Sequence, residues 1–487
     1  MKKIFWQISL LWAIILAGGC EFLDVTEAEP NPNLTQDNIL QTNNPMTPWV
    51  NGMERQMAVV YNNMVTELEL VSDNYDNTAS FYNQNFDVPD INYADGDVDD
   101  LLFVLADLRE SALFGINTVA EADPEATDNQ IAEMYFFLGW AHLLSGEIFV
   151  AVPAEAAGPA VEPAQHFQLA IQAFQDALAL TTDAEKQLSY QLALARAYYA
   201  SGDQAAAVTA ANAVVNGDDD FLRFVEFDGV NGPASTIQDA IYDRTNLFDL
   251  QPLPRLDFLD PKFHGLDATS QVDLAFQKAE EAYLILAEAA IADNNLDAAK
   301  AQMLDLLDLV AARPVQAVPE TDPRRNNGGA GDQRPNSSAI EVRASASDPF
   351  REGLLLNRVK GEATSVLVTV PTISGTSVTA EMINALSTQD AALETLYLMR
   401  QEIFFAEGRR MFDLGIRFAV SRDEVIQNDN ILEDSPFIES FVPDFIPLNS
   451  EMDAYLFEAS TNQVTILHNM NKVIVNNKNA AVVVPFL

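Results

Sequence analysis

The side chains best suited to chemistry in this sequence are its four histidines and its many carboxylates. The histidines, His142, His166, His264 and His468, are scattered, and no two have the spacing of a metal-binding pair. The sequence contains no H-E-x-x-H motif, no glycine-rich phosphate loop and no G-x-S-x-G nucleophile turn. The 72 Asp and Glu residues are so numerous that close acidic pairs arise by chance, so paired-acid hydrolysis stays open without positive support. The sequence therefore predicts a protein that is not an enzyme.

The single cysteine, Cys20, has the surroundings of a lipid-attachment site. Lys2 and Lys3 precede an apolar stretch, residues 4–17, that is too short for a transmembrane helix and is typical of a signal peptide. An Ala-Gly-Gly run then leads directly to the cysteine, as in a bacterial lipobox. We expect residues 1–19 to be removed and the Cys20 thiol to carry acyl chains such as palmitate, which anchor the chain stably to a membrane. An ordinary signal peptide followed by a chance cysteine is the alternative.

Length and charge limit the class of protein. The chain has 487 residues, 48% of them apolar, so it can bury several domain-sized cores. With 27 basic and 72 acidic residues the formal net charge is −45. A field of that sign repels polyanions, which argues against nucleic-acid binding.

Three segments in the middle of the chain resemble one another. They are 138–146, 194–202 and 286–294, each rich in Ala and ending in Gly or Asn, and each is followed by a second amphipathic helix pattern. Small residues at the turn and along one face allow two helices to pack antiparallel, as in tetratricopeptide hairpins. Because one hairpin cannot bury its apolar face alone, we expect the three to stack. Unrelated helices of a generic α-helical domain are the alternative.

The complete prediction is a mainly α protein built as a tetratricopeptide-like superhelix of hairpins, with a loop-rich C-terminal part that contains short strands. Residues 20–50, which hold several Pro and Asn, are expected to form a lipidated, extended tether. Residues 51–310 form the helical scaffold with loop insertions, including helices at 51–72 and 99–122. Residues 311–487 form the loop-rich part, with strands near 365–370 and a helix at 391–412.

Two further patterns could bind something small. Asp95, Asp97 and Asp99 are spaced like the start of a calcium loop, but the Gly and Glu that such a loop requires are missing. We expect a helix N-cap at Asp99 or Asp100 instead, so no cofactor and no metal site is predicted and calcium is a weak alternative. A polar segment also contains aromatic rings that could stack on a sugar or a peptide, or could merely pin the loop to the helices. Its candidate ligand-binding residues are Asn74, Tyr75, Phe81, Tyr82 and Tyr93.

The parts together resemble the SusD/RagB-like outer-membrane lipoproteins of Bacteroidota. The start Cys-Glu-Phe-Leu-Asp-Val, residues 20–25, is similar to the lipidated start of the family, and residues 133–141 are similar to one of its helices. The most specific match is residues 400–414, similar to the pattern R-x-x-E-x-x-x-E-G-x-R-x-x-D-L. Its predicted structural residues are Arg400, Glu407, Gly408, Arg410 and Asp413. At i, i+4 spacing, Asp413 is expected to pair with Arg409 and with Arg417, and Gly408 to allow close helix approach.

This resemblance implies a function. The family implies a non-catalytic lipoprotein on the outer membrane, facing the cell exterior, that binds nutrient and delivers it to a SusC-like TonB-dependent transporter. The ligand is an oligosaccharide in most of the family and a peptide in one branch. The alternative is a tetratricopeptide-type structural lipoprotein that scaffolds envelope assembly.

Overall fold

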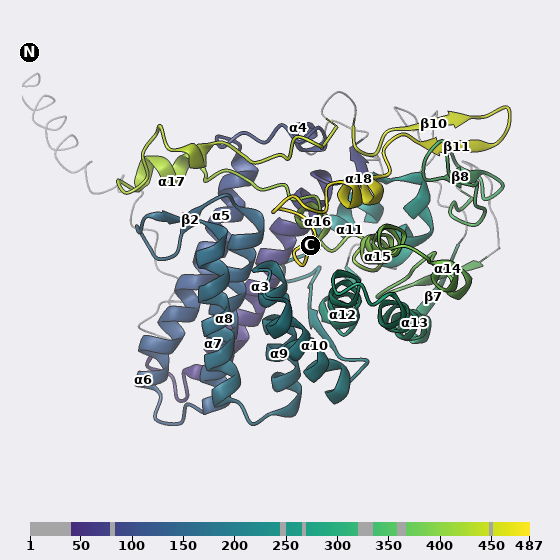
Figure 1. Cartoon of the computed structure of the whole chain (residues 1–487). Coiled ribbons are helices and arrows are strands. Elements are labelled where there is room, and N and C mark those ends of the chain that lie inside the picture. Colours follow the sequence, from purple (N-terminus) through teal and green to yellow (C-terminus); the bar gives the residue numbers. More distant parts are fainter. Residues whose placement is uncertain are drawn as a thin grey trace, which may run out of the picture.

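Long helices form most of the molecule (Figure 1). The computed structural model describes residues 40–77, 83–243, 250–264, 269–319, 335–357, 367–447 and 451–487. Cys20, Phe81 and Tyr82 lie outside these ranges. The long helices are α3 (Met46–Leu70), α5 (Gly96–Phe114), α7 (Asp128–Ile148), α8 (Pro163–Leu180), α9 (Ala184–Ala200), α10 (Gln204–Gly217), α12 (Glu280–Ala292), α13 (Leu296–Ala312) and α15 (Gln389–Ile403).

Shorter helical segments connect and cover these. They are α4 (Gln84–Asp87), the π-helix η1 (Gly115–Val119), α6 (Ala120–Ala122), α11 (Thr236–Gln238), the π-helix η2 (Asp239–Asp243), the 3₁₀-helix η3 (Pro254–Phe263), α14 (Ala380–Ala385), α16 (Arg410–Asp413), α17 (Arg422–Gln427), the 3₁₀-helix η6 (Pro436–Ile438) and α18 (Met470–Asn476). No helix in the described ranges combines the length and apolarity needed to cross a lipid bilayer.

The three predicted hairpins are present. They are α7–α8, α9–α10 and α12–α13, and they pack in sequence, α8 on α9 and α10 on α12 (Figure 1). Close packing of the first hairpin depends on Gly139, where a Cβ would lie 2.6 Å from the Phe174 ring of α8. The α7 start is fixed by a reciprocal capping box between Thr127 and Gln130. The prediction of a mainly helical, tetratricopeptide-like fold is therefore confirmed.

The strands are short and form small separate sheets. They are β1 (Tyr75–Asn77), β2 (Val152–Pro153), β3 (Ala160–Val161), β4 (Leu222–Val225), β5 (Leu250–Pro252), β6 (Leu274–Lys278), β7 (Val315–Pro319), β8 (Glu341–Arg343), β9 (Leu367–Pro371), β10 (Tyr455–Glu458) and β11 (Gln463–Ile466). The antiparallel pairs are β1–β5, β2–β3, β4–β6, β7–β9 and β10–β11, and β8 adds to β11 in parallel. As predicted, β-branched residues near 365–370 form a strand, β9.

Three predicted boundaries differ from the structure. Helix α3 begins at Met46, so the last residues of the predicted tether are helical. The N-cap of α5 is Asp95, whose side chain accepts the Asp97 N–H at 3.0 Å, and not Asp99 or Asp100. Residues 391–412 are not one helix, because α15 ends at Ile403 and α16 starts at Arg410.

The break between α15 and α16 has a backbone cause. Ala406 and Gly408 have positive φ angles of 58° and 69°, which no right-handed helix can contain. At Gly408 the backbone approaches α3 closely: its N–H donates to Glu69 Oε1 at 2.7 Å, and a Cβ would lie 3.4 Å from Val65 Cα. The predicted close approach at Gly408 is therefore present, although it occurs in a turn and not within a helix.

This geometry predicts the effect of Gly408→Ala. A left-handed conformation costs a residue with a Cβ about 1–2 kcal/mol, so the free energy of unfolding should fall by that amount. Urea unfolding followed by circular dichroism measures the change. The matched control is Gly52→Ala in α3, where the added Cβ meets nothing within 4 Å; alanine is the better helix former and should not destabilise. Equal stability of the two variants would contradict the argument.

Candidate functional site

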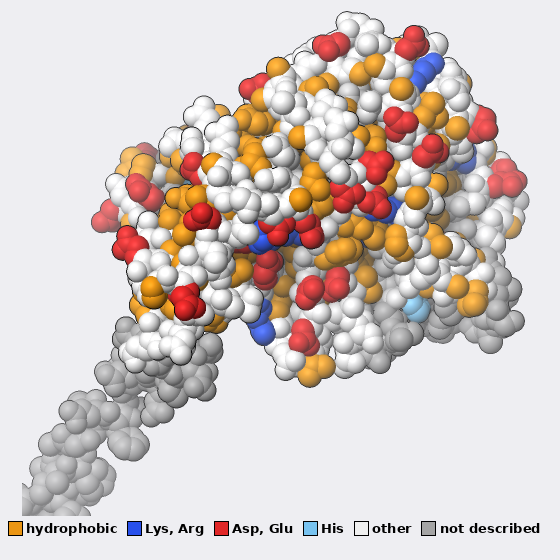
Figure 2. Space-filling model, turned by 90° about the horizontal axis from the view of Figure 1, so that it is seen from below, with side chains coloured by type: hydrophobic (Ala, Val, Ile, Leu, Met, Phe, Trp, Pro, Cys, Tyr) orange, Lys and Arg blue, Asp and Glu red, His pale blue; other side chains and the backbone are white. Residues whose placement is uncertain are grey.

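An open cleft of about 780 Å³ lies between the first turns of α3, strand β4 and the loop 226–233. Its walls carry three acids, two arginines and an exposed aromatic ring, namely Glu54, Glu226, Asp228, Arg55, Arg223 and Phe224. Figure 2 shows the molecule from below, with acidic and basic side chains interspersed among apolar ones on this face. A cleft of this size is within the range of small-molecule sites.

Strand β4 supplies the central residues of the cleft. It pairs with β6, and the register shifts between Arg223 and Phe224. Such a bulge changes the direction of a side chain relative to regular alternation. Phe224 is 39% exposed, which is high for a phenylalanine, whereas Val225 is buried in the core.

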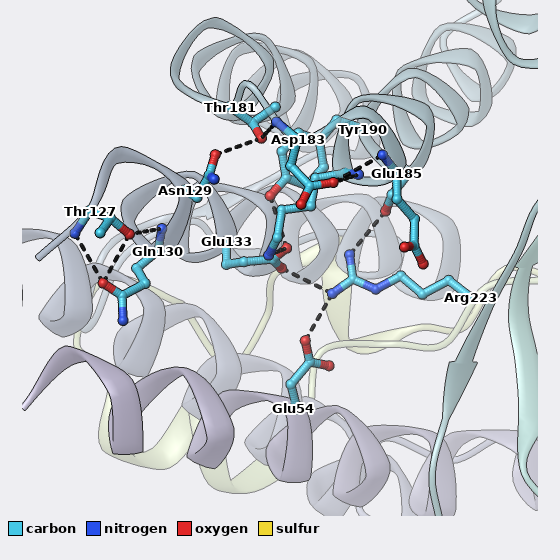
Figure 3. A network of polar contacts seen from close by, with 12 residues as sticks. Glu54, Thr127, Asn129, Gln130, Glu133, Thr181, Asp183, Glu185, Tyr190 and Arg223 are labelled. Carbon is cyan, nitrogen blue, oxygen red and sulfur yellow. Dashed lines mark hydrogen bonds and ion pairs between the residues drawn. The ribbon is translucent and has the colours of Figure 1, made fainter. Parts of the chain in front are cut away.

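Arg223 joins three helices at the base of the cleft. Its Nη2 donates to Glu54 Oε1 of α3 and to Glu133 Oε2 of α7, both at 2.9 Å, and its Nη1 donates to Ser189 Oγ of α9 at 2.9 Å (Figure 3). The guanidinium also lies over the Phe136 ring, 4.3 Å from the centroid. A planar cation held by several acceptors and an aromatic face is rigid.

Glu133 is the buried partner of this network. Its other oxygen accepts hydrogen bonds from Lys186 Nζ and, at 3.0 Å, from Tyr190 Oη. Burial alone would raise the pKa of Glu133, but the charges of Arg223 and Lys186 outweigh it and hold the pKa below its usual value. Glu133 therefore stays ionised and fixes Arg223, which gives the cleft a charged, pre-organised floor.

The loop beside the floor is held by its own polar groups. Asp228 accepts the backbone N–H groups of Val230 at 2.8 Å and Asn231 at 2.9 Å. Arg55 of α3 donates to the Asn231 carbonyl at 2.6 Å and so ties the loop to the helix. Among the described residues, Asn51 and Glu226 make no side-chain hydrogen bond, so both are available to a ligand.

The arrangement suits a polar ligand with a flat apolar face. Phe224 offers a ring for stacking, while Asn51 and Glu226 can bond to hydroxyl groups. Arg223 and Asp228, by contrast, are engaged in structural bonds. The cleft therefore has the features of a binding site and holds no evident nucleophile with an activating base.

The structure places the predicted ligand-binding residues elsewhere. Asn74 is 1% exposed; its amide donates to Glu69 at 2.8 Å, and its carbonyl oxygen accepts from Gln401 at 3.0 Å. Tyr75 is fully buried and stacks on Phe405, with ring centroids 4.9 Å apart. At both positions the side chain is packed inside the protein, as in the alternative that this segment is pinned to the helices.

Tyr93 is half-buried in the segment between α4 and α5. Its backbone carbonyl accepts the Arg422 N–H at 2.8 Å. None of Asn74, Tyr75 and Tyr93 lines the cleft, and their predicted contact with a ligand stays a prediction.

The predicted motif at 400–414 is a centre of buried ion pairs. Asp413 pairs with Arg400 at 2.6 Å. The prediction that Asp413 pairs with Arg409 and with Arg417 was wrong, because the helix is interrupted. Arg409 instead pairs with Glu281 of α12 at 2.5 Å.

The other two charges of the motif also reach across the fold. Arg410 pairs with Asp73 at 2.6 Å, and Glu407 accepts from Lys278 at 2.7 Å and also from Lys262. The segment is therefore joined to other parts of the fold by buried ion pairs, and these partners could not be read from residue spacing.

Two histidines that are scattered in the sequence meet in the fold. His142 of α7 and His166 of α8 are buried with their Nδ1 atoms 3.2 Å apart. His166 Nε2 lies 3.0 Å from the Val152 carbonyl, which can only accept. A neutral His166 therefore accepts at Nδ1 from His142 Nδ1–H, and the pair is a satisfied core contact.

One acidic group in the described ranges has the geometry of a metal site. It consists of Asp218, Asp219 and Asp220, which directly follow α10. The Asp95 segment considered for calcium is not such a group; there Asn83 donates to Asp95 at 2.6 Å and to Asp97 at 3.1 Å.

Comparison with known proteins identifies the fold. No family model matches the sequence, and no curated protein matches it. Solved structures do match. A SusD superfamily protein from Bacteroides fragilis is 14% identical, with 81% of this chain and 100% of that chain covered and a TM-score of 0.53.

Two further structures agree. A SusD superfamily protein from Parabacteroides distasonis is 11% identical, covers 80% of this chain and 98% of its own, and has a TM-score of 0.52. A proposed sugar-binding protein from Bacteroides vulgatus is 11% identical, with 81% and 99% covered and a TM-score of 0.50. The chain therefore has the SusD-like fold, which confirms the resemblance at the level of structure.

The histidine pair predicts how stability depends on pH. Burial, followed by the neighbouring histidine and by Arg109, lowers the pKa of His142 to about 3; burial and Arg109 lower that of His166 to about 4. Between these values and the usual 6.5 the unfolded chain binds more protons, so stability falls as the pH drops through this window. At pH 5 each histidine should contribute a loss of about 2 kcal/mol relative to pH 7.5.

The measurement is urea unfolding between pH 7.5 and 5. A variant with His142→Gln and His166→Gln should show a shallower loss of stability with falling pH than the wild type. His264→Gln, which leaves the pair intact, is the control. A double variant with an unchanged pH profile would show that the pair is not held neutral.

Proposed function

We propose that this protein is a non-catalytic, lipid-anchored protein of the outer membrane that binds an oligosaccharide nutrient and delivers it to a SusC-like TonB-dependent transporter. A peptide nutrient is the second possibility for the ligand. The cleft of about 780 Å³, with its pre-organised floor and exposed Phe224, is the observation that carries the binding role. The SusD-like fold supports the class, and the proposed sugar-binding protein from Bacteroides vulgatus supports the ligand.

The sequence alone supports the proposed anchor and location. The apolar leader and the small residues before Cys20 support export and acylation, which would hold the chain at the cell exterior. A binding protein needs no bond chemistry, which is consistent with a cleft in which Arg223 and Asp228 serve structural contacts and no nucleophile lies beside an activating base. Mass spectrometry of the mature N-terminus tests the anchor, because a free thiol at Cys20 would contradict it.

A structural scaffold is the second candidate. The stacked hairpins α7–α8, α9–α10 and α12–α13 form the kind of array that binds other proteins. Crosslinking in native membranes separates the two functions. Recovery of a TonB-dependent transporter supports delivery, and recovery of envelope-assembly proteins with no bound glycan or peptide supports scaffolding.

Phe224→Ala tests the cleft. Removing the exposed ring should weaken binding of neutral oligosaccharides about tenfold, equivalent to about 1.4 kcal/mol, because the stacking surface is lost. Isothermal titration against a panel of oligosaccharides measures the affinity.

The matched control is Phe103→Ala. Phe103 lies on α5, is 68% exposed and does not line the cleft, so its loss should leave the affinity unchanged. Wild-type protein that bound none of the panel would argue against a carbohydrate ligand, and equal losses in both variants would argue against this cleft.

A further inference from the structure

A second, smaller cavity of about 250 Å³ lies between η3, the segment after β8, α15 and the start of α18. α15 and α18 pack against each other and lie, with β8, in the right-hand half of Figure 1. The smaller cavity shares no lining residue with the larger cleft. Its volume is below the range of about 300–1,000 Å³ that is usual for drug-sized ligands, so it fits a single sugar or amino-acid residue.

Arg255 of η3 lines this cavity and is an exception among the buried arginines. It is only 7% exposed, yet within the part of the chain that the structure describes its guanidinium has no hydrogen-bond or ion-pair partner. Other buried arginines are paired: Arg196 with Glu147, Arg313 with Glu280, Arg400 with Asp413, Arg409 with Glu281 and Arg410 with Asp73. An arginine remains charged under such conditions, so Arg255 is an uncompensated buried cation.

The acids whose charges act on Arg255 are already engaged. Glu402 accepts from Thr376 Oγ1 at 2.7 Å and from the backbone N–H and Oγ of Ser377 at 2.7 and 2.6 Å. Asp73 accepts from Arg410 and Gln401. Burial lowers the pKa of Arg255, and the charges of Glu402 and Asp73 oppose that shift only in part. The protein therefore does not supply the anion that this side chain lacks.

The rest of the cavity favours a singly charged anion. Arg351 also lines it and donates to Ser377, while Glu394 accepts from Asn469 at 2.8 Å and Asp348 from Ser345 at 2.6 Å. Both acids are engaged by these neighbours, so neither serves as the counter-ion of Arg255. A dianion such as phosphate would create an excess negative charge in a protein of net charge −45.

Apolar side chains complete the wall. Met382 and Leu398 line the cavity and can contact the carbon skeleton of a ligand. The guanidinium is a planar fork that matches a carboxylate with two parallel hydrogen bonds.

We propose that this cavity binds the carboxylate of a ligand residue, with Arg255 as the anchoring cation. Two sources share this chemistry: an acidic sugar with a ring carboxylate, and the terminal carboxylate of a peptide. The proposal does not depend on the proposed function of the larger cleft, because the two sites share no residue.

Matched ligand pairs test the proposal. D-Galacturonate is compared with D-galactose, and N-acetylalanine with its amide, by isothermal titration of the wild-type protein at low ionic strength. We expect at least one carboxylate to bind at least tenfold more tightly than its neutral counterpart. Preference for galacturonate alone identifies an acidic sugar, and preference for N-acetylalanine alone identifies a peptide end. Equal affinity within both pairs overturns the proposal.

Arg255→Met tests the anchor. The variant should lose the tenfold preference, whereas Arg55→Met in the other cleft should keep it. Without ligand, Arg255→Met should melt no lower than the wild type, because it removes an unpaired charge, while Arg313→Met should melt lower, because it leaves Glu280 buried and unpaired.

A second substitution at the same position keeps the test valid if the Arg255→Met variant misfolds. Arg255→Lys keeps the charge but loses the planar fork, so the preference should fall at least threefold without being abolished. A preference that is unchanged in both Arg255 variants, or an Arg255→Met variant as unstable as Arg313→Met, overturns the assignment.

Discussion

Buried charge is the constraint on which this structure depends. The segment 400–414 places six charged side chains in the interior. Arg400 and Asp413 pair with each other, and three of the others pair with oppositely charged residues from different parts of the chain. Arg410 binds Asp73 beyond α3, Arg409 binds Glu281 in α12, and Glu407 binds Lys278 in β6. Removing one member of a buried pair leaves the other uncompensated, at a cost of about 3–5 kcal/mol, so these pairs allow only one arrangement of the helices around the segment.

The same constraint explains the two cavities. In the larger cleft Glu133 and Glu54 neutralise Arg223, so the guanidinium is fixed and the cleft has a rigid floor. In the smaller cavity Arg255 has no such partner among the described residues, and a bound anion would complete the pattern seen at the other buried arginines. A buried charge that is paired within the protein has a structural role, whereas a buried charge without a partner indicates a binding site for a ligand of opposite charge.

The helices could be predicted because their signals are local. Periodic apolar residues located α8, α10 and α13, and the repeated Ala-rich segments located the hairpins that contain them. The break after Ile403 was missed because Ala406, a good helix former, has a positive φ that only the surrounding packing explains. Likewise Asn74 and Tyr75 look like loop residues, but contacts with Gln401 and Phe405, more than 300 residues away in the sequence, bury them.

The candidate site was much harder to predict than the fold. Arg223 is a single basic residue in a short strand. The sequence around it gives no sign of its partners, Glu54 of α3 and Glu133 of α7. The meeting of His142 and His166 depends in the same way on how α7 and α8 pack. Pairings of this kind are set by tertiary structure, so residue spacing carries no signal for them.

The burial of lysine and arginine side chains also determines where proteases can cleave the folded chain. The buried basic residues are Arg109, Arg196, Arg255, Lys262, Lys278, Arg313, Arg400, Arg409 and Arg410. In the described ranges only Arg55, Arg422 and Lys472 are exposed. Trypsin must draw a lysine or arginine into its specificity pocket, so at most of these positions it can cut only after the surrounding helices have opened. Tryptic digestion within these ranges therefore reports mainly on unfolding, whereas a protease that cleaves after glutamate finds many accessible sites on the intact surface.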